Sequence, residues 1–202
     1  MKIKLCEVFE GIQGEGRYVG KPMLFVRFSG CTRACPWCDT QYHIEGKEVE
    51  INFVEDKIKE YRGGFVCFTG GEPLFQKEVC REIIRDFKCL KEFHLETNGD
   101  LLESKDFDFF DYIVVSPKDV EVAKRACKFR YDNFNLDIKV VTDLKTVGLD
   151  LLKYATMVMP LTTTNEEKNR KIAQDVWRYC VKNNQNFCSR IHYYIWGKKR
   201  KV

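Results

Sequence analysis

Three cysteines lie close together in the segment "SGCTRACPWCDT", at the spacing C-x3-C-x2-C directly after the apolar run "MLFVRF". They are Cys31, Cys35 and Cys38. Thiolates at this spacing can converge on one small object only if the segment loops around it. Such ligands suit zinc or an iron–sulfur cluster. The spacing therefore predicts a metal centre on a short loop.

The number of cysteines bears on which metal centre this is. A structural zinc site needs a fourth ligand, for which Asp39, His43 or Cys6 are candidates, but no second C-x2-C pair follows in the sequence. An iron–sulfur cluster with three protein ligands keeps one iron open for a substrate or cofactor. Thiols that merely fill a core fit poorly, because Thr32 and Pro36 belong to a polar, proline-containing stretch. The pattern favours a cluster over zinc and over inert thiols, and it leaves all three open.

A second motif, "TGGEP" at residues 69–73, ends the apolar run "FVCF". Gly70 and Gly71 allow close backbone approach, and Pro73 suits the first turn of a following helix. Alone, this motif is typical of an ordinary turn. Polar or turn-like residues also end other apolar runs, as "ETNG", "SPK" and "MPL".

Short apolar runs rich in β-branched and aromatic residues predict strands, and stretches with apolar residues at three- and four-residue steps predict helices. The predicted strands are 23–30, 65–71, 93–99, 112–118, 136–142, 155–161 and 191–196, and the clearest predicted helices are 74–90 and 166–183. Alternating strands and helices predict right-handed crossovers and a mainly parallel sheet.

The chain length selects among parallel α/β folds. A complete (β/α)8 barrel takes about 250 residues, whereas this chain has 202. We therefore predict a single domain, residues 1–202, with an open, partial (β/α) barrel of about six parallel strands and few helices. A flat, doubly wound sheet is the alternative. In both folds the active site gathers at the carboxyl ends of the strands, where these motifs fall.

Composition restricts the classes of function. No apolar run approaches the roughly 20 residues of a membrane helix, and the N-terminus lacks the apolar segment of a secretion signal, which predicts a cytoplasmic protein. The net charge is +4, and the basic end "GKKRKV" is interpreted as solvated rather than as a nucleic-acid site. Ten cysteines indicate a reducing compartment. The seven outside the loop are predicted to be small buried residues: Cys6, Cys67, Cys80, Cys89, Cys127, Cys180 and Cys188.

Taken together, the cysteine loop and the "GGEP" turn resemble the radical S-adenosylmethionine superfamily. In that superfamily the loop holds a [4Fe–4S] cluster whose open iron is chelated by the amino and carboxylate groups of S-adenosylmethionine. Within it, the chain resembles the 7-carboxy-7-deazaguanine synthase family from Glu7 to Arg200. The matching stretches are "EVFEGIQGEG", "FVRFSGC", "WCDT", "TGGEPL", "ETNG", "SPK" and "HYYIWGKKR".

The resemblance implies a lyase that converts 6-carboxy-5,6,7,8-tetrahydropterin to 7-carboxy-7-deazaguanine with loss of ammonia, a step towards queuosine or archaeosine. It also implies a homodimer, an electron donor such as flavodoxin or ferredoxin, and no nucleic-acid or membrane partner. A glycyl-radical-enzyme activase would share the cysteine loop but act on a protein and lack "IQGEG". A zinc or iron–sulfur binding module without catalysis is the more distant alternative.

The resemblance also assigns site residues. The cluster ligands would be Cys31, Cys35 and Cys38, and Thr40 would bind Mg²⁺. The substrate would contact Ile12, Gln13, Gly14, Arg27 and Thr69. S-adenosylmethionine would contact Trp37, Cys38, Asp39, Gly71, Ser116, Pro117 and Lys118.

Several of these assignments have a plain alternative on the residues alone. Arg27 is otherwise a surface arginine on an edge strand, Thr40 a turn or helix-capping residue, and residues 12–14 a simple loop. Glu96, at the end of a predicted strand, is expected to offer hydrogen bonds to ribose or substrate. His192, on the predicted last strand, is kept outside the catalytic set.

Overall fold

The computed structural model describes residues 1–133 and 135–201, and in this part of the chain a nine-stranded sheet has the order β3-β1-β2-β4-β5-β6-β7-β8-β9. The strands are β1 (Lys2–Ile12), β2 (Pro22–Phe28), β3 (Lys47–Glu50), β4 (Phe65–Gly70), β5 (Glu92–Thr97), β6 (Tyr112–Val115), β7 (Leu136–Thr142), β8 (Met157–Pro160) and β9 (Asn186–Phe187). The helices are α1 (Ile51–Glu60), α2 (Lys77–Phe87), α3 (Val120–Asp132), α4 (Glu166–Asn183) and α5 (Ile191–Trp196).

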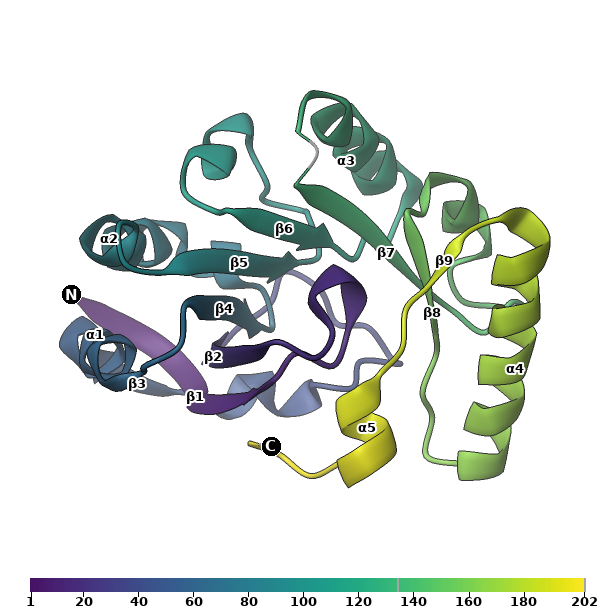
Figure 1. Cartoon of the computed structure of the whole chain (residues 1–202), viewed down its shortest axis with the longest axis horizontal. Coiled ribbons are helices and arrows are strands. Elements are labelled where there is room, and N and C mark those ends of the chain that lie inside the picture. Colours follow the sequence, from purple (N-terminus) through teal and green to yellow (C-terminus); the bar gives the residue numbers. More distant parts are fainter. Residues whose placement is uncertain (134, 202) are drawn as a thin grey trace.

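The predicted parallel strands are confirmed. Each neighbouring pair from β2 through β4, β5, β6 and β7 to β8 is parallel, and the short β9 extends the same run. β1 pairs antiparallel with both β2 and β3. The sheet curves without closing, and α1 to α4 follow its outer side while α5 lies on the inner side (Figure 1). A flat doubly wound sheet carries helices on both faces, so the open barrel is the correct alternative.

The two faces of the sheet differ because successive strand residues point to opposite sides. Apolar residues such as Val26, Phe68 and Leu95 belong to the main buried core, together with residues of α1 to α4 such as Ile84. The residues between them in the strands include Arg27, Thr69, Glu96 and Lys139. The core therefore lies between sheet and outer helices, and the inner face carries polar groups.

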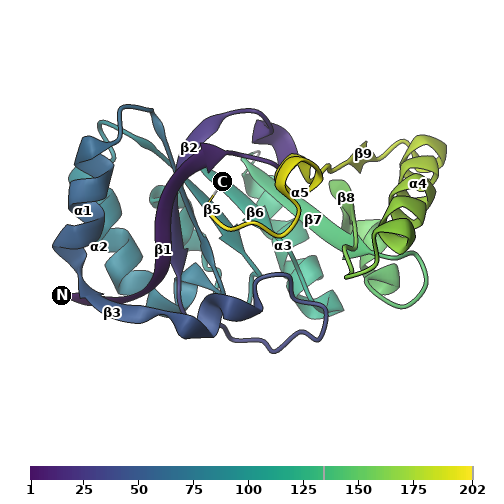
Figure 2. The ribbon, with the colours of Figure 1, turned by 90° about the horizontal axis from the view of Figure 1, so that it is seen from below.

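The sequence prediction missed β1 and the short strands β3 and β9, and it placed a strand where a helix lies. β1 was not predicted, although its sequence alternates between exposed Lys2 and Lys4 and buried Ile3 and Leu5. The strand predicted at 191–196 is wrong, because these residues form α5, with helical bonds such as Gly197 N–H to Tyr193 O (2.8 Å). Strand propensity reflects packing on a pleated surface, and this aromatic segment instead crosses the inner side beyond β9 (Figure 2).

The cysteines outside the loop are only partly as predicted. Cys67, Cys80, Cys180 and Cys188 are buried, Cys6 and Cys127 are half-buried, and Cys89 is exposed. Cys89 follows the last turn of α2 on the outside of the molecule, where nothing covers it among the described residues. Over the same described ranges, no helix has both the length and the apolar character that a bilayer crossing requires.

A buried histidine lies on the inner side of β5. His94 is 2% exposed, and its ring lies 4.3 Å from that of Tyr18, 5.5 Å from Phe65 and 5.2 Å from Tyr112. No hydrogen-bond partner of its Nε2 atom is present in residues 1–133 and 135–201. This burial lowers the pKa of His94 to about 4, because the charged imidazolium loses its hydration there.

We expect this histidine to make the protein less stable in mild acid. The unfolded chain takes up the proton near pH 6.5, whereas folded His94 stays neutral until about pH 4. The contribution of His94 to stability is therefore full above pH 6.5 and falls as the pH drops towards 4, by up to roughly 3 kcal/mol. Urea unfolding at pH 7 and pH 5 measures the loss. In His94→Phe the difference in unfolding free energy between pH 7 and pH 5 should be smaller than in the unsubstituted protein. If the difference is the same in both proteins, His94 is not its cause.

Candidate active site

The loop from Gly30 to Thr40, here called the cluster loop, contains no helix or strand and follows β2 directly. Its start is bound to the "GGEP" turn after β4. Gly71 N–H donates to Phe28 O (3.2 Å), and Glu72 N–H donates to Gly30 O (2.9 Å). The cysteine motif and the "GGEP" turn therefore meet at the carboxyl ends of β2 and β4, as the sequence predicts.

Both glycines of the turn are required by close backbone packing. A Cβ atom on Gly71 would lie 2.1 Å from Gly30 O, and one on Gly70 would lie 2.3 Å from Phe28 O. Gly70 also has φ +141°, a conformation that side chains rarely adopt. The motif is thus more than an ordinary turn, because its glycines let two backbones touch beside the cysteines.

Backbone N–H groups contact two of the three cysteine sulfur atoms of the cluster loop. Arg33 N–H donates to Cys31 Sγ and Thr40 N–H donates to Cys38 Sγ, each at 3.4 Å. Cys38 N–H donates to Cys35 O (3.1 Å) and closes a turn between these two cysteines. Burial raises the pKa of the Cys35 and Cys38 thiols. A bound metal centre would hold them deprotonated.

The three cysteines suit an iron–sulfur cluster. Among residues 1–133 and 135–201, no three His, Cys, Asp or Glu side chains are grouped so that they could hold a single ion. Zinc needs its ligands within about 2.3 Å of one point. A cluster spreads its ligands over several irons and takes thiolates with hydrogen bonds to sulfur. Three half-buried thiols with two N–H···S contacts match that chemistry.

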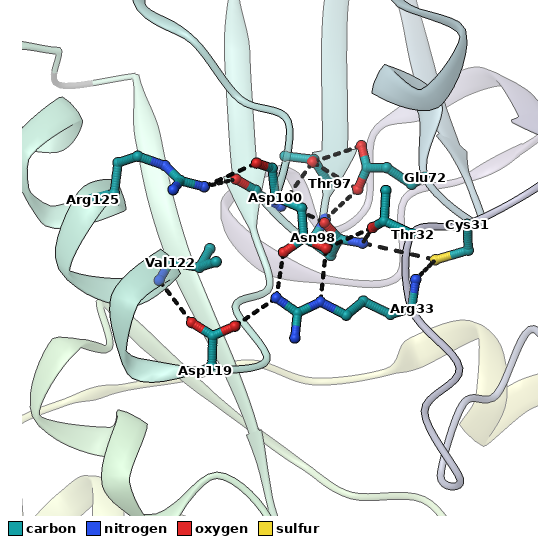
Figure 3. A network of polar contacts seen from close by, with 11 residues as sticks. Cys31, Thr32, Arg33, Glu72, Thr97, Asn98, Asp100, Asp119, Val122 and Arg125 are labelled. Atoms are coloured by element: carbon teal, nitrogen blue, oxygen red, sulfur yellow. Dashed lines mark hydrogen bonds and ion pairs between the residues drawn. The ribbon is translucent and has the colours of Figure 1, made fainter.

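A buried carboxylate joins the "GGEP" turn to the "ETNG" segment (Figure 3). Glu72 is fully buried and accepts hydrogen bonds from Thr97 Oγ1 (2.8 and 2.9 Å), Asn98 N–H (2.7 Å) and Leu74 N–H (3.0 Å). Burial raises the pKa of Glu72 to about 7, against the opposing effect of these donors. The ends of β4 and β5 are therefore held as one unit beside the cluster loop.

The "SPK" segment approaches the cluster loop from β6. Lys118 Nζ lies 5.1 Å from the centre of the Trp37 ring, within the range of a cation–π contact. Burial lowers the pKa of Lys118. Ser116 N–H donates to Thr97 O (2.8 Å), and Pro117 is buried. The predicted cofactor residues of the cluster loop and of the "SPK" segment thus lie close together. The side chain of Asp39 is half-exposed.

On the inner face, three of the predicted substrate residues surround or adjoin one carboxylate. Glu96 Oε2 accepts from Thr69 Oγ1 (2.8 Å), and Glu96 Oε1 accepts from Gln13 Nε2 (3.1 Å). Arg27 and Thr69 face each other in the parallel register of β2 and β4. Glu96 was predicted only as a general hydrogen-bonding group, and here it is central to the inner face.

Arg27 is an inward arginine, not one on the surface. Its side chain is 15% exposed, and its Nε donates to Glu7 Oε1 (2.9 Å), whose side chain is 1% exposed. Glu7 Oε2 also accepts from Nη2 of Arg200 (3.2 Å), whose guanidinium lies 3.8 Å from the centre of the Tyr42 ring. Glu7, Tyr42 and Arg200 were not predicted as partners of Arg27.

A second ionic group lies where the N-terminal "QGEG" segment meets the C-terminal part of the chain. Glu15 Oε2 pairs with Lys139 Nζ (2.5 Å), and Glu15 Oε1 pairs with Arg190 Nε (3.1 Å). Arg190 also pairs with Asp39 of the cluster loop. Burial opposes ionisation of Glu15, but Lys139 and Arg190 hold its pKa below the usual range.

The remaining predicted substrate residues lie at the start of the same segment. Ile12 ends β1 and is 48% exposed. Gly14 O accepts from Ile191 N–H (3.0 Å), and a Cβ atom on Gly14 would lie 2.1 Å from His192 Nδ1. The "QGEG" segment is therefore covered by the beginning of α5, with His192 beside it rather than on a strand.

Comparison with known proteins agrees with this arrangement. Residues 25–178 match the family model of the radical SAM superfamily. A protein of Aquifex aeolicus named 7-carboxy-7-deazaguanine synthase is 34% identical over 157 residues, which cover 75% of this chain and 69% of that protein. A protein of the same name from Thermoplasma acidophilum is 41% identical over 125 residues, 59% of each chain.

The extent of these matches varies. The chain spans 59% of the Thermoplasma acidophilum protein and 54% of the equally named one from Hyperthermus butylicus. A crystal structure of QueE from Escherichia coli shares the fold, with a TM-score of 0.65, 17% identity and 93% coverage of both chains. The chain belongs to the radical SAM superfamily and, within it, to the family of proteins named 7-carboxy-7-deazaguanine synthase.

Proposed function

We propose that this protein converts 6-carboxy-5,6,7,8-tetrahydropterin to 7-carboxy-7-deazaguanine with loss of ammonia, a carbon–nitrogen lyase reaction of 7-deazapurine biosynthesis. The observation that carries the proposal is the group of polar side chains on the inner face of the sheet. There Gln13 and Thr69 converge on Glu96, at 3.1 and 2.8 Å, with Arg27 opposite Thr69. These groups match a planar heterocycle with N–H groups and one carboxylate. The names of the relatives support the same reaction.

The cysteines of the cluster loop would hold a [4Fe–4S] cluster, and Trp37–Asp39, Gly71 and Ser116–Lys118 would hold S-adenosylmethionine. When bound, these two groups supply radical chemistry that removes a hydrogen atom from the substrate. The chain's own contribution is then to hold the substrate in place and to exclude water.

Charge complementarity gives each inner-face residue a role. Arg27 stays protonated beside buried Glu7, and its planar guanidinium suits the carboxylate of the pterin. Glu96 accepts hydrogen bonds, so it suits the N–H groups of the ring, which would replace its present bonds from Gln13 and Thr69. The covering segment that begins at Ile191 would keep water from this face.

Mass spectrometry of the products tests the proposal. The protein is reconstituted without oxygen with iron and sulfide, then given reductant, S-adenosylmethionine, Mg²⁺ and 6-carboxytetrahydropterin. We expect 7-carboxy-7-deazaguanine and 5′-deoxyadenosine only in the complete mixture. If 5′-deoxyadenosine forms without that product, the substrate assignment is wrong and a glycyl-radical-enzyme activase becomes the leading candidate. If neither forms and zinc is bound, a non-catalytic module is indicated.

We also propose that Thr40 binds Mg²⁺ next to the substrate carboxylate. Its hydroxyl donates to Asp39 Oδ1 (2.9 Å) at the end of the cluster loop, so both oxygens are near each other. Loss of one ligand should raise the Mg²⁺ concentration for half-maximal rate roughly tenfold, equivalent to about 1.4 kcal/mol. We expect this for Thr40→Ala and not for Thr40→Ser, in initial rates measured against Mg²⁺. An identical Mg²⁺ response in all three proteins would remove the assignment.

For partners, we propose a homodimer in a reducing cytoplasm with a flavodoxin or ferredoxin as electron donor. The family resemblance supports the homodimer and the electron donor, and the ten cysteines, all of them free thiols, support the reducing compartment. Sedimentation equilibrium gives the oligomeric state, and cofactor cleavage with each reduced donor compares the donors.

A further inference from the structure

Arg33, the middle residue between Cys31 and Cys35, makes an ion pair outside the cluster loop (Figure 3). Its Nε donates to Asp100 Oδ2 (2.7 Å) and its Nη2 donates to Asp100 Oδ1 (2.5 Å). This is the two-pronged geometry that makes arginine–carboxylate pairs strong and directional. The side chain of Asp100 is 16% exposed and that of Arg33 is 32% exposed, so the pair is partly shielded from water.

The same guanidinium reaches a second carboxylate. Arg33 Nη2 donates to Asp119 Oδ2 (2.5 Å), while Asp119 Oδ1 accepts from Val122 N–H (2.9 Å) and so caps the first turn of α3. Asp100 follows "ETNG" and Asp119 follows "SPK" in the sequence. Arg33 therefore connects the cluster loop to the ends of both β5 and β6.

The acceptor Asp100 is itself fixed in place. Its Oδ2 also accepts from Thr32 Oγ1 (2.6 Å), and Thr32 Oγ1 accepts from Asn98 Nδ2 (2.8 Å). Arg125 Nη2 donates to the backbone oxygens of Gly99 (2.6 Å) and Asp100 (3.1 Å). Hydrogen bonding to Arg33 lowers the pKa of Asp100. The pair thus rests on a rigid support, not on two free surface side chains.

We infer that Arg33 is a positioning residue that preorganises the cluster loop and holds Cys31 and Cys35 at the strand ends before the cluster is assembled. This inference rests on the proposed cluster at the three cysteines. The loop lacks helix and strand throughout, and fixing such backbone costs about 1–2 kcal/mol per residue. A side-chain anchor in the middle of the motif offsets part of that cost without contacting the metal.

Hydrogen–deuterium exchange of the apoprotein tests the inference directly. We expect amides of residues 30–40 to exchange roughly tenfold faster in Arg33→Ala, equivalent to about 1.4 kcal/mol of lost local stability. The exchange rate of these amides in Arg33→Lys should lie between the rates in Arg33→Ala and in the unsubstituted protein, because lysine keeps the charge but not the paired donors. The control is Arg81→Lys, which alters another arginine–aspartate pair, that of Arg81 on α2 with buried Asp106 (2.7 Å). It should leave exchange of residues 30–40 unchanged.

Release of iron from the reconstituted protein to a chelator is the second readout. Loss of residues that orient metal ligands typically weakens metal binding about 10–100-fold, so we expect release to quicken by a similar factor in Arg33→Ala. Asp100→Asn, which preserves the shape of the side chain, should also make iron release faster. The double substitution Arg33→Ala with Asp100→Asn should have less than the summed effect of the two single ones, because both weaken the Arg33–Asp100 pair.

Unchanged exchange and unchanged iron release in a folded Arg33→Ala protein would overturn the inference. If Arg33→Ala does not fold, Arg33→Lys and Asp100→Asn decide it by the same two readouts. Neither measurement uses the pterin, and the exchange measurement uses no cluster. A failed product assay therefore leaves the positioning role testable on its own.

Discussion

Cys35→Ala is expected to abolish both the visible absorbance of the reconstituted cluster and all turnover. The cluster loop supplies only three thiols, and the loss of one leaves two irons without protein ligands in a site that already keeps one position open. Iron analysis and visible absorbance after anaerobic reconstitution measure the effect. The residual rate is followed by 5′-deoxyadenosine formation.

Cys89→Ala is the matched control for this substitution. Cys89 is exposed and lies beyond α2, away from the cluster loop, so its variant should bind iron and turn over like the unsubstituted protein. A Cys35→Ala protein that retains full iron content and cofactor cleavage would show that the cluster is bound elsewhere.

Arg27→Lys is expected to raise KM for the pterin by roughly 100-fold, equivalent to about 2.7 kcal/mol. Lysine preserves a positive partner for buried Glu7, but its point charge lacks the paired donors that suit a carboxylate. Cluster absorbance and cleavage of S-adenosylmethionine without pterin should stay unchanged. Steady-state kinetics with varied pterin give the KM and kcat values.

Truncation of Arg27 needs a different design, because Glu7 would lose its nearest cation while 1% exposed. Glu7 would then depend on Arg200, which is 39% exposed. Because breaking a buried ion pair costs up to about 3–5 kcal/mol, Arg27→Ala alone mixes stability with binding. Arg27→Gln combined with Glu7→Gln removes both charges together. If that pair, or Arg27→Lys, loses the cluster as completely as Cys35→Ala does, Arg27 supports the loop and the assignment to substrate is wrong.

The parts of the fold that could be predicted from the sequence are those with a local signal. Strands buried on one or both faces give uninterrupted apolar runs, which is why β2 and β4 to β8 were found. β1 carries a clear alternation of Lys2, Ile3, Lys4 and Leu5, so its signal was present but weaker than that of the runs. The segment 191–196 has the composition of a strand but forms a helix. Its composition alone does not indicate this helix, which lies across the inner face of the sheet.

The same distinction holds for the candidate site. Its motifs are local, and the structure brings the cysteine loop, "GGEP", "ETNG" and "SPK" to one edge of the sheet. Its ion pairs are not local: Glu15 contacts Lys139 and Arg190, residues far away in sequence. No spacing rule reports such pairs. A lysine inside the apolar run "LDIKVV" was the one available sign that an acid faces it.

The contact between Arg200 and Glu7 joins the last part of the described chain to its first strand, as the yellow tail lying towards β1 indicates (Figure 2). During synthesis on the ribosome, the sheet from β1 to β8 can be complete while Arg190 and Arg200 are still to be made. Glu7 and Glu15 then face the inner side without their C-terminal cations. Each of these carboxylates then has one cation, Arg27 for Glu7 and Lys139 for Glu15, so the inner face is less positive than in the longer chain and attracts an anionic substrate less strongly.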